Sequence, residues 1–276
     1  MQEQDTSRLA DGAAPDIKTV IDASSPFPPI HRVGVLRPLA WLRLGWRDFT
    51  LAPGMSLFFG LCFAGMGWLL KLIFSNAPEY LSALSTGFLL LGPILSLGLY
   101  DLSRRLEKQA GGMQEALFAI RGRWSNIGTL ALVLGVIMLV WARASMVLFA
   151  LFYDRGMPTM ESFMTFLSFG NPEFLLMYGC LGFLFASIVF AISWVSFPLM
   201  LDRDTDAISA MIISGVAWGN NMPATAVWAL LIVGLVVLGF STWNLGLIVA
   251  MPVVGHATWH AYREVIGHSD LPVDTR

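Results

Sequence analysis

Long apolar stretches alternate with short polar ones from residue 53 onward. Six of them are close to the roughly 20 residues that an α-helix needs to cross a bilayer core; they cover about residues 53–74, 80–100, 127–147, 175–199, 223–241 and 244–264. As one helix the last two would measure about 60 Å, twice the thickness of that core. We therefore place a tight hairpin between them, and the pattern predicts an all-α polytopic membrane helix bundle of six transmembrane helices.

The segments that precede the hairpins also follow a pattern. Each contains Trp-x-Asx, at residues 46–48, 124–126 and 218–220, where the Asp or Asn can cap the following helix. Upstream of the first two, apolar side chains recur at helical spacing: Leu39, Leu42, Trp46 and Phe49, then Met113, Leu117, Ile120 and Trp124. We expect three hairpins, each preceded by an interfacial amphipathic helix.

The organisation along the chain follows from where polar residues gather. The first 34 residues are polar and rich in proline, a composition typical of disorder. The predicted domains are a disordered cytoplasmic tail at 1–34, a six-helix transmembrane domain at 35–268 and a short C-terminal tail at 269–276.

Composition supports a membrane location. Of the 276 residues 56% are hydrophobic and 13% charged, against about 25% charged in soluble domains, which excludes a water-soluble globule. The net charge of -2 gives no reason to expect nucleic acid as a partner. The lipid bilayer is the expected surrounding.

The basic residues predict the orientation, because Lys and Arg near short loops stay on the cytoplasmic side. With six spans and a cytoplasmic N-terminus, 14 of the 17 basic residues lie on the inner side. Both termini are therefore expected in the cytoplasm. None of the 19 Asp and Glu falls within a predicted span, which argues against ion-coupled transport but leaves a passive pore open.

Small residues and prolines shape the predicted helices. Gly60, Ala64 and Gly67 would let a neighbouring helix approach the first span closely. The returning helix of each hairpin contains one proline, at Pro93, Pro198 or Pro252, which should kink it. Three kinked helices could open a central cavity.

The outer loop at residues 156–172 is the longest. Met160, Phe163, Met164 and Leu167 follow helical spacing there, which indicates a short amphipathic cap. It either rests on the outer leaflet or docks a membrane-protein partner.

Two histidines form the one constellation with metal chemistry. His256 and His260 are four residues apart, so they share a helix face and could present two imidazoles to haem or another metal. The alternative is structural, with both rings bonded to carbonyls or hydroxyls near the membrane boundary.

Two charged clusters lie at the cytoplasmic ends of the proline-containing returning helices and are candidate binding sites. The first contains Asp101, Arg104, Arg105 and Glu107, and the second contains Asp202, Arg203, Asp204 and Asp206. They predict either an ion-pair network between helix ends or a site for a lipid headgroup or ligand. No nucleophile, zinc-protease or phosphate-loop motif is present, so we expect no enzyme.

Several stretches resemble an uncharacterised family of bacterial integral membrane proteins. They are GLYDLSRRLE at 98–107, VSFPLMLDRD at 195–204, HATWHAYR at 256–263, and GWRD at 45–48 followed by Pro53. The similarity spans roughly residues 35–266. It implies a location in the bacterial inner membrane and a domain of unknown function, and some members carry a cytochrome c oxidase subunit label.

Three function classes remain. The first is a non-enzymatic scaffold or assembly factor of a membrane complex, such as a respiratory one. The second is a passive channel or carrier for a small neutral or lipidic molecule. The third is a haem or metal protein that uses His256 and His260; the first two classes need no cofactor.

Overall fold

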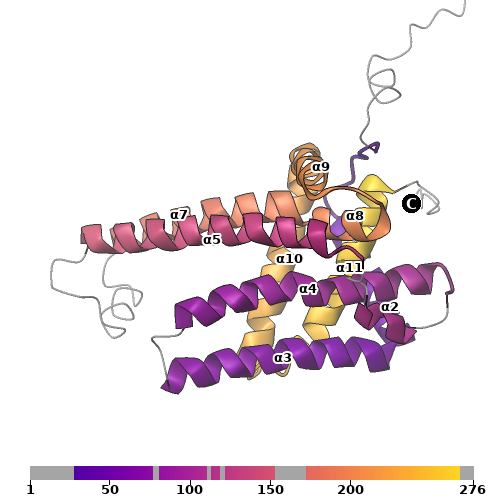
Figure 1. Cartoon of the computed structure of the whole chain (residues 1–276), viewed down its shortest axis with the longest axis horizontal. Coiled ribbons are helices and arrows are strands. Elements are labelled where there is room, and N and C mark those ends of the chain that lie inside the picture. Colours follow the sequence, from indigo (N-terminus) through magenta and orange to yellow (C-terminus); the bar gives the residue numbers. More distant parts are fainter. Residues whose placement is uncertain (1–27, 77–80, 111–112, 119–121, 153–171, 268–276) are drawn as a thin grey trace, which may run out of the picture.

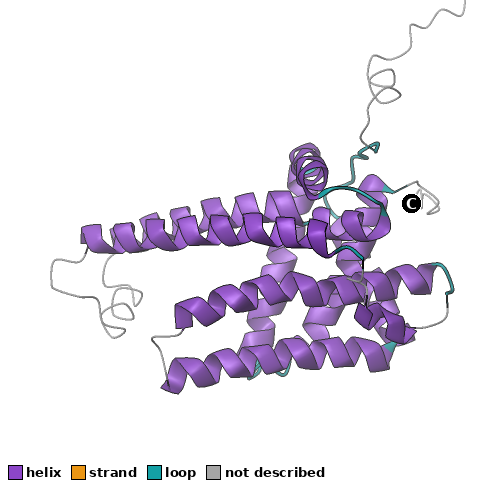
Figure 2. Ribbon diagram, viewed as in Figure 1, coloured by secondary structure: helices purple, strands orange, loops and turns teal. Residues whose placement is uncertain are grey.

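The computed structural model describes residues 28–76, 81–110, 113–118, 122–152 and 172–267, and the regular elements within these ranges are helices (Figure 2). They are α2 (Arg37–Leu51), α3 (Pro53–Asn76), α4 (Leu81–Glu107), the 3-10 helix η2 (Met113–Phe118), α5 (Trp124–Phe152), α7 (Pro172–Ser193), α8 (Ser196–Asp202), α9 (Ala207–Asn220), α10 (Met222–Ser241) and α11 (Leu247–Ile266).

Each predicted apolar stretch coincides with a long helix, but the number of membrane spans is only partly supported. Among the described residues, three segments are long and apolar enough to cross a membrane, namely α5, residues 172–202 and α10. A fourth is added if α2 and α3, which meet at 110°, count as one bent span. The six expected spans are therefore not all found, and α11, which contains His256, His260, Arg263 and Glu264, is not among the candidates.

The long helices contact one another in consecutive pairs. Helix α3 packs against α4, α5 against α7, and α10 against α11. Figure 1 shows α5 and α7 side by side, with α3 and α4 below them and α10 and α11 crossing behind. Helix α11 contacts α2, α3, α4, α8 and α10, so it is the centre of the fold.

Glycine allows two helices to reach α11. A Cβ atom on Gly60 of α3 would lie 1.9 Å from the carbonyl oxygen of Ile248, and one on Gly45 of α2 would lie 2.5 Å from that of Val253. Such backbone approach is how helices associate in lipid. The predicted packing role of Gly60 is confirmed.

Helix α2 precedes the first long helix as predicted, and the face that it buries in the protein is not the apolar stripe. The inward residues are Pro38, Trp41, Gly45 and Asp48, whereas Leu39 and Trp46 are each 52% exposed. The apolar stripe therefore faces away from the other helices, and the face whose glycine permits close packing is the one buried in the protein. Of the second expected interfacial helix, the structure describes only η2 at its start.

The predicted Asx caps are wrong. Asp48 and Asn126 lie inside α2 and α5, and their side chains bond other helices and loops. Neighbouring Asn221, rather than Asn220, is the anchoring residue, because its amide binds the backbone of His31 and Val33. The partners of Asp48 and Asn126 are distant in the sequence, so the local Trp-x-Asx pattern could not show that these side chains bond other elements and do not cap a helix.

Those contacts tie the end of the predicted N-terminal tail to the body of the protein. The backbone N–H of His31 also donates to the carbonyl of Val265 at 2.8 Å. Residues 1–27 and 268–276 lie outside the described residues, as does the predicted docking loop 156–172 apart from Pro172, which begins α7. Of the three prolines predicted to kink the returning helices, Pro198 lies in the first turn of α8, after a break at residues 194–195, and Pro252 lies inside α11. The side chain of Pro93 is not among those described.

Candidate functional site

A buried chain of hydrogen bonds joins the two histidines of α11 to three other helices. Ser103 of α4 donates to Asp48 of α2 at 2.7 Å, and its oxygen lies 2.7 Å from Nδ1 of His256. Nε2 of His256 lies 3.0 Å from the hydroxyl of Ser56 on α3, and Nε2 of His260 lies 2.8 Å from the same Asp48 oxygen. We call these five residues the histidine chain.

The donors in this chain follow from its one carboxylate. Because ionised Asp48 can only accept, the Ser103 hydroxyl must donate to it. Nδ1–H of His256 then donates to the Ser103 oxygen, which leaves Nε2 to accept from the Ser56 hydroxyl. Both ring nitrogens of His256 have a partner, so His256 fits this site as a neutral ring although its side chain is fully buried.

The histidine chain can be compared with the two interpretations of His256 and His260, a metal site and a structural role. His256 bonds two hydroxyls, as the structural alternative expected, whereas His260 bonds a carboxylate. Within the described ranges, no group of three or more His, Cys, Asp or Glu could hold a metal ion. A metal on His256 would also have to displace one of the serine hydroxyls. What the chain does directly is join α2, α3, α4 and α11 through buried polar contacts.

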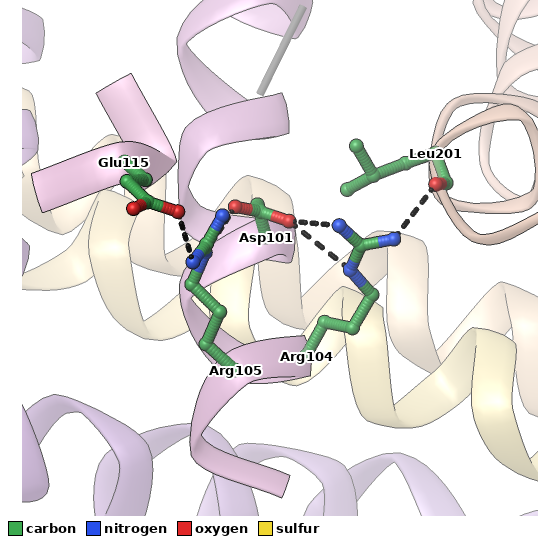
Figure 3. Close-up of polar contacts among 5 residues, drawn as sticks. All are labelled: Asp101, Arg104, Arg105, Glu115 and Leu201. Atoms are coloured by element: carbon green, nitrogen blue, oxygen red, sulfur yellow. Dashed lines mark hydrogen bonds and ion pairs between the residues drawn. The ribbon is translucent and has the colours of Figure 1, made fainter. Parts of the chain in front are cut away.

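The first predicted charged cluster forms ion pairs around one buried carboxylate. Asp101, whose side chain is 1% exposed, accepts from Arg104 through Oδ1 and from Arg105 through Oδ2 at 2.7 Å (Figure 3). Arg105 also pairs with Glu115 of η2 at 2.9 Å, and Arg104 donates to the carbonyl of Leu201 in α8 at 3.1 Å. The hydrogen bond that Arg105 donates to Asp101 raises the pKa of Arg105, so its positive charge is fixed.

The second predicted cluster bonds to the end of α11 rather than to the first cluster. The hydroxyl of Tyr262 donates to Asp202 at 2.8 Å, and Arg263 lies 3.9 Å from the same carboxylate. Arg203 donates to the backbone carbonyl of Ile266 at 3.2 Å. The expected ion-pair network thus exists, and its common partner is α11.

Asp206 has a different role from the rest of the second cluster. Its carboxylate accepts the backbone N–H of Ser209 at 3.0 Å and so caps the start of α9. Hydrogen bonds from the Ser209 side chain and backbone lower the pKa of Asp206 below its ordinary value.

Sequence reasoning missed two further attachments of α11. Glu264 accepts from Arg37 at 2.7 and 3.1 Å and from the indole of Trp41 at 2.7 Å. The indole of Trp259 donates to Glu107 at 3.0 Å. Each pair is separated by more than 150 positions in the chain, and no local pattern marks such partners.

A cavity of about 430 Å³ lies between α4, α7, α10 and α11. Its wall is mainly aromatic and aliphatic, with contributions from Phe190, Trp194, Phe240 and Met251. Helices α4 and α11 contribute to both the cavity and the histidine chain: Tyr100 and Thr258 line the cavity, whereas Ser103 and His256 belong to the chain.

Polar groups gather at one part of the cavity wall. The hydroxyl of Tyr100 lies beside those of Ser96 and Thr258, and Ser193 lines the same space. The indole N–H of Trp228 is fully buried, and none of the described residues bonds it. The hydroxyl groups of this wall, in contrast, offer hydrogen bonds to an oxygen that enters the cavity.

Comparison with known proteins supports the membrane assignment. Residues 81–202 match the model of a family described as predicted integral membrane protein (DUF2189). This match confirms the family resemblance over that segment, which includes residues 98–107 and all but the last two residues of 195–204, whereas residues 45–48 and 256–263 lie outside the match. No curated protein and no solved structure matches the chain.

Proposed function

Taking the chain as an integral membrane protein similar to that family, we propose that it is a non-enzymatic binding protein or passive carrier for a small lipidic molecule. The observation that carries this proposal is the cavity between α4, α7, α10 and α11. Its volume of about 430 Å³ falls within the range of small-molecule sites, roughly 300–1,000 Å³.

The chemistry of the wall favours an amphiphile with one oxygen-bearing end. An acyl or other hydrocarbon part suits the aromatic and aliphatic side, which includes Phe240 and Met251. The oxygen would accept from the hydroxyl of Tyr100 or Ser193, both of which line the cavity. Few polar groups placed in an apolar pocket are what fixes the orientation of a bound ligand.

A cavity-filling substitution tests the proposal. Gly92 of α4 lines the cavity, and a Cβ atom there would meet no heavy atom within 4 Å. We expect Gly92→Leu to fill the space without disturbing the helices. The matched control is Gly234→Leu on α10, where a Cβ atom also meets nothing and which does not line the cavity.

The measurement is photolabelling of the full chain in lipid nanodiscs with a diazirine-bearing fatty acid. We expect crosslinks on the cavity residues of α4, α10 and α11 in the wild type and in Gly234→Leu, and severalfold fewer in Gly92→Leu. Equal labelling of the two variants, with both proteins folded by circular dichroism, would refute binding in this cavity.

A scaffold or assembly role is the second candidate, and the exposed faces of α5 and α7 favour it. Leu151 and Phe183 are 74% and 77% exposed, and a shallow apolar groove between the two helices includes Cys180 and Leu184. Wide apolar surface of this kind can receive a helix of another membrane protein as well as lipid.

Native gel electrophoresis in a mild detergent tests this second role. Leu184→Trp would obstruct the groove, whereas Leu230→Trp changes an exposed leucine of α10 outside it. We expect a complex larger than the monomer in the wild type and the control, and its loss in Leu184→Trp. A monomer in all three would remove this candidate.

We further propose six spans with both termini in the cytoplasm of a bacterial inner membrane. The support is that the ends of α4, α8 and α11 bring Arg104, Arg203 and Arg263 to one end of the fold. Reporter fusions at both termini should report the same side, and opposite sides would contradict the six-span topology.

A further inference from the structure

Helix α2 is held at a fixed angle to the helix that follows it. It meets α3 at 110°, so if α3 crosses the bilayer α2 lies close to the membrane plane. Its buried face is fastened to α11 by the hydrogen bond from Trp41 to Glu264 and by the close approach at Gly45. The opposite face is therefore presented in one orientation.

That opposite face combines basic and apolar side chains. Arg43 and Arg47 are exposed and one helical turn apart, and Leu39 and Trp46 beside them are each 52% exposed. Trp46 stacks on Phe49 with ring centroids 5.5 Å apart. Tryptophan next to arginine is the arrangement found where a helix lies at the level of lipid headgroups.

The two arginines differ from five others whose partners lie within the protein. Arg37, Arg104, Arg105 and Arg263 pair with protein carboxylates, and Arg203 binds a backbone carbonyl. Within the part of the chain that the structure describes, no ion pair or hydrogen bond is formed by the side chains of Arg43 and Arg47.

No acid neutralises this face from within α2. The helix has one carboxylate, Asp48, and it is buried against Ser103 and His260. Two guanidinium groups one turn apart offer forked donors that suit phosphate oxygens better than ammonium groups do.

We propose that Arg43 and Arg47 form a binding site for the phosphate of an anionic membrane lipid. The lipid phosphate is received between the two guanidinium groups, while Leu39 and Trp46 contact its acyl chains. Neither arginine lines the cavity, so this proposal does not depend on the ligand proposed for the cavity.

Native mass spectrometry of the detergent-solubilised full chain tests the site, with phosphatidylglycerol and phosphatidylcholine added in parallel. The wild type should prefer phosphatidylglycerol. An arginine near an anionic surface strengthens attachment by roughly fivefold, so Arg43→Gln with Arg47→Gln should weaken phosphatidylglycerol binding by roughly 25-fold. Arg43→Lys with Arg47→Lys should fall in between, because it keeps the charge and loses the fork.

Two controls make the result decisive. Arg143→Gln removes an exposed arginine of α5 and should change the lipid preference little. Excess inorganic phosphate should not displace the lipid, since it lacks the acyl chains. The proposal is overturned if the double glutamine variant, folded as judged by an unchanged melting temperature, retains the wild-type preference, or if inorganic phosphate competes fully.

Discussion

The contact between α3 and α11 at Gly60 gives the sharpest test of the fold. A Cβ atom on Gly60 would lie 1.9 Å from the oxygen, 2.7 Å from the carbon and 3.0 Å from the Cα atom of Ile248. All three are backbone atoms, so no side-chain rotation can relieve the clash. The carbonyl of Ile248 faces Pro252 one helical turn later, and proline has no N–H to bond it.

The expected cost of Gly60→Ala follows from this geometry. Ordinary contact needs about 3.5 Å, so α3 and α11 must separate by roughly 1.5 Å at this level. Overpacking typically costs about 1–3 kcal/mol. Separation would also stretch the 3.0 Å contact between Ser56 and His256, a further loss of about 1 kcal/mol. We expect the free energy of unfolding to fall by about 2–4 kcal/mol.

Gly65→Ala is the matched control, because Gly65 lies on the same helix and a Cβ atom there meets nothing within 4 Å. Replacing a helical glycine by alanine in open space should stabilise by up to about 1 kcal/mol. Both variants would be unfolded with denaturing detergent in mixed micelles and followed by circular dichroism. If Gly60→Ala is as stable as Gly65→Ala, the close packing of α3 on α11 is wrong.

Two further predictions concern carboxylates. Asp48→Asn should lower the free energy of unfolding by about 2–3 kcal/mol, measured by the same titration. The reason is that an amide has no charged oxygen to accept the hydrogen bonds of Ser103 and His260. An unchanged stability would contradict the histidine chain. Because the folded-state pKa of Asp206 is lowered, its cap stabilises α9 above the ordinary carboxyl pKa of about 3.9 and is lost as pH falls through the lowered value. Asp206→Asn should therefore weaken the acid destabilisation seen in melting scans between neutral pH and pH 3, and identical pH profiles would argue against it.

The candidate site was only half visible in the sequence. Helical spacing placed His256 and His260 on one face, and that pairing needs nothing beyond the local helix. Their partners could not be found in the same way, because Ser56 and Ser103 lie 200 and 153 positions from His256. A serine in an apolar helix carries no signal that it will meet a histidine.

Helix α2 shows which property local patterning leaves undecided, namely the face that packs against other helices. The stripe with Leu39 and Trp46 is the more apolar one, and in water it would face the core. In a membrane protein an apolar side chain gains nothing by leaving lipid for protein, so the packing face is decided by close approach at Gly45 and by the hydrogen bond of Trp41.

The sequence by itself determined that the chain is built from long apolar helices and which parts of the chain form them, because backbone hydrogen bonding within a helix and the length of an apolar run are local properties. Only the tertiary structure decided that α11 is the centre, that the cavity opens beside α4, and which of the charged groups are already paired. Those outcomes depend on the rotation of each helix about its axis and on contacts between distant residues, such as that between Arg37 and Glu264.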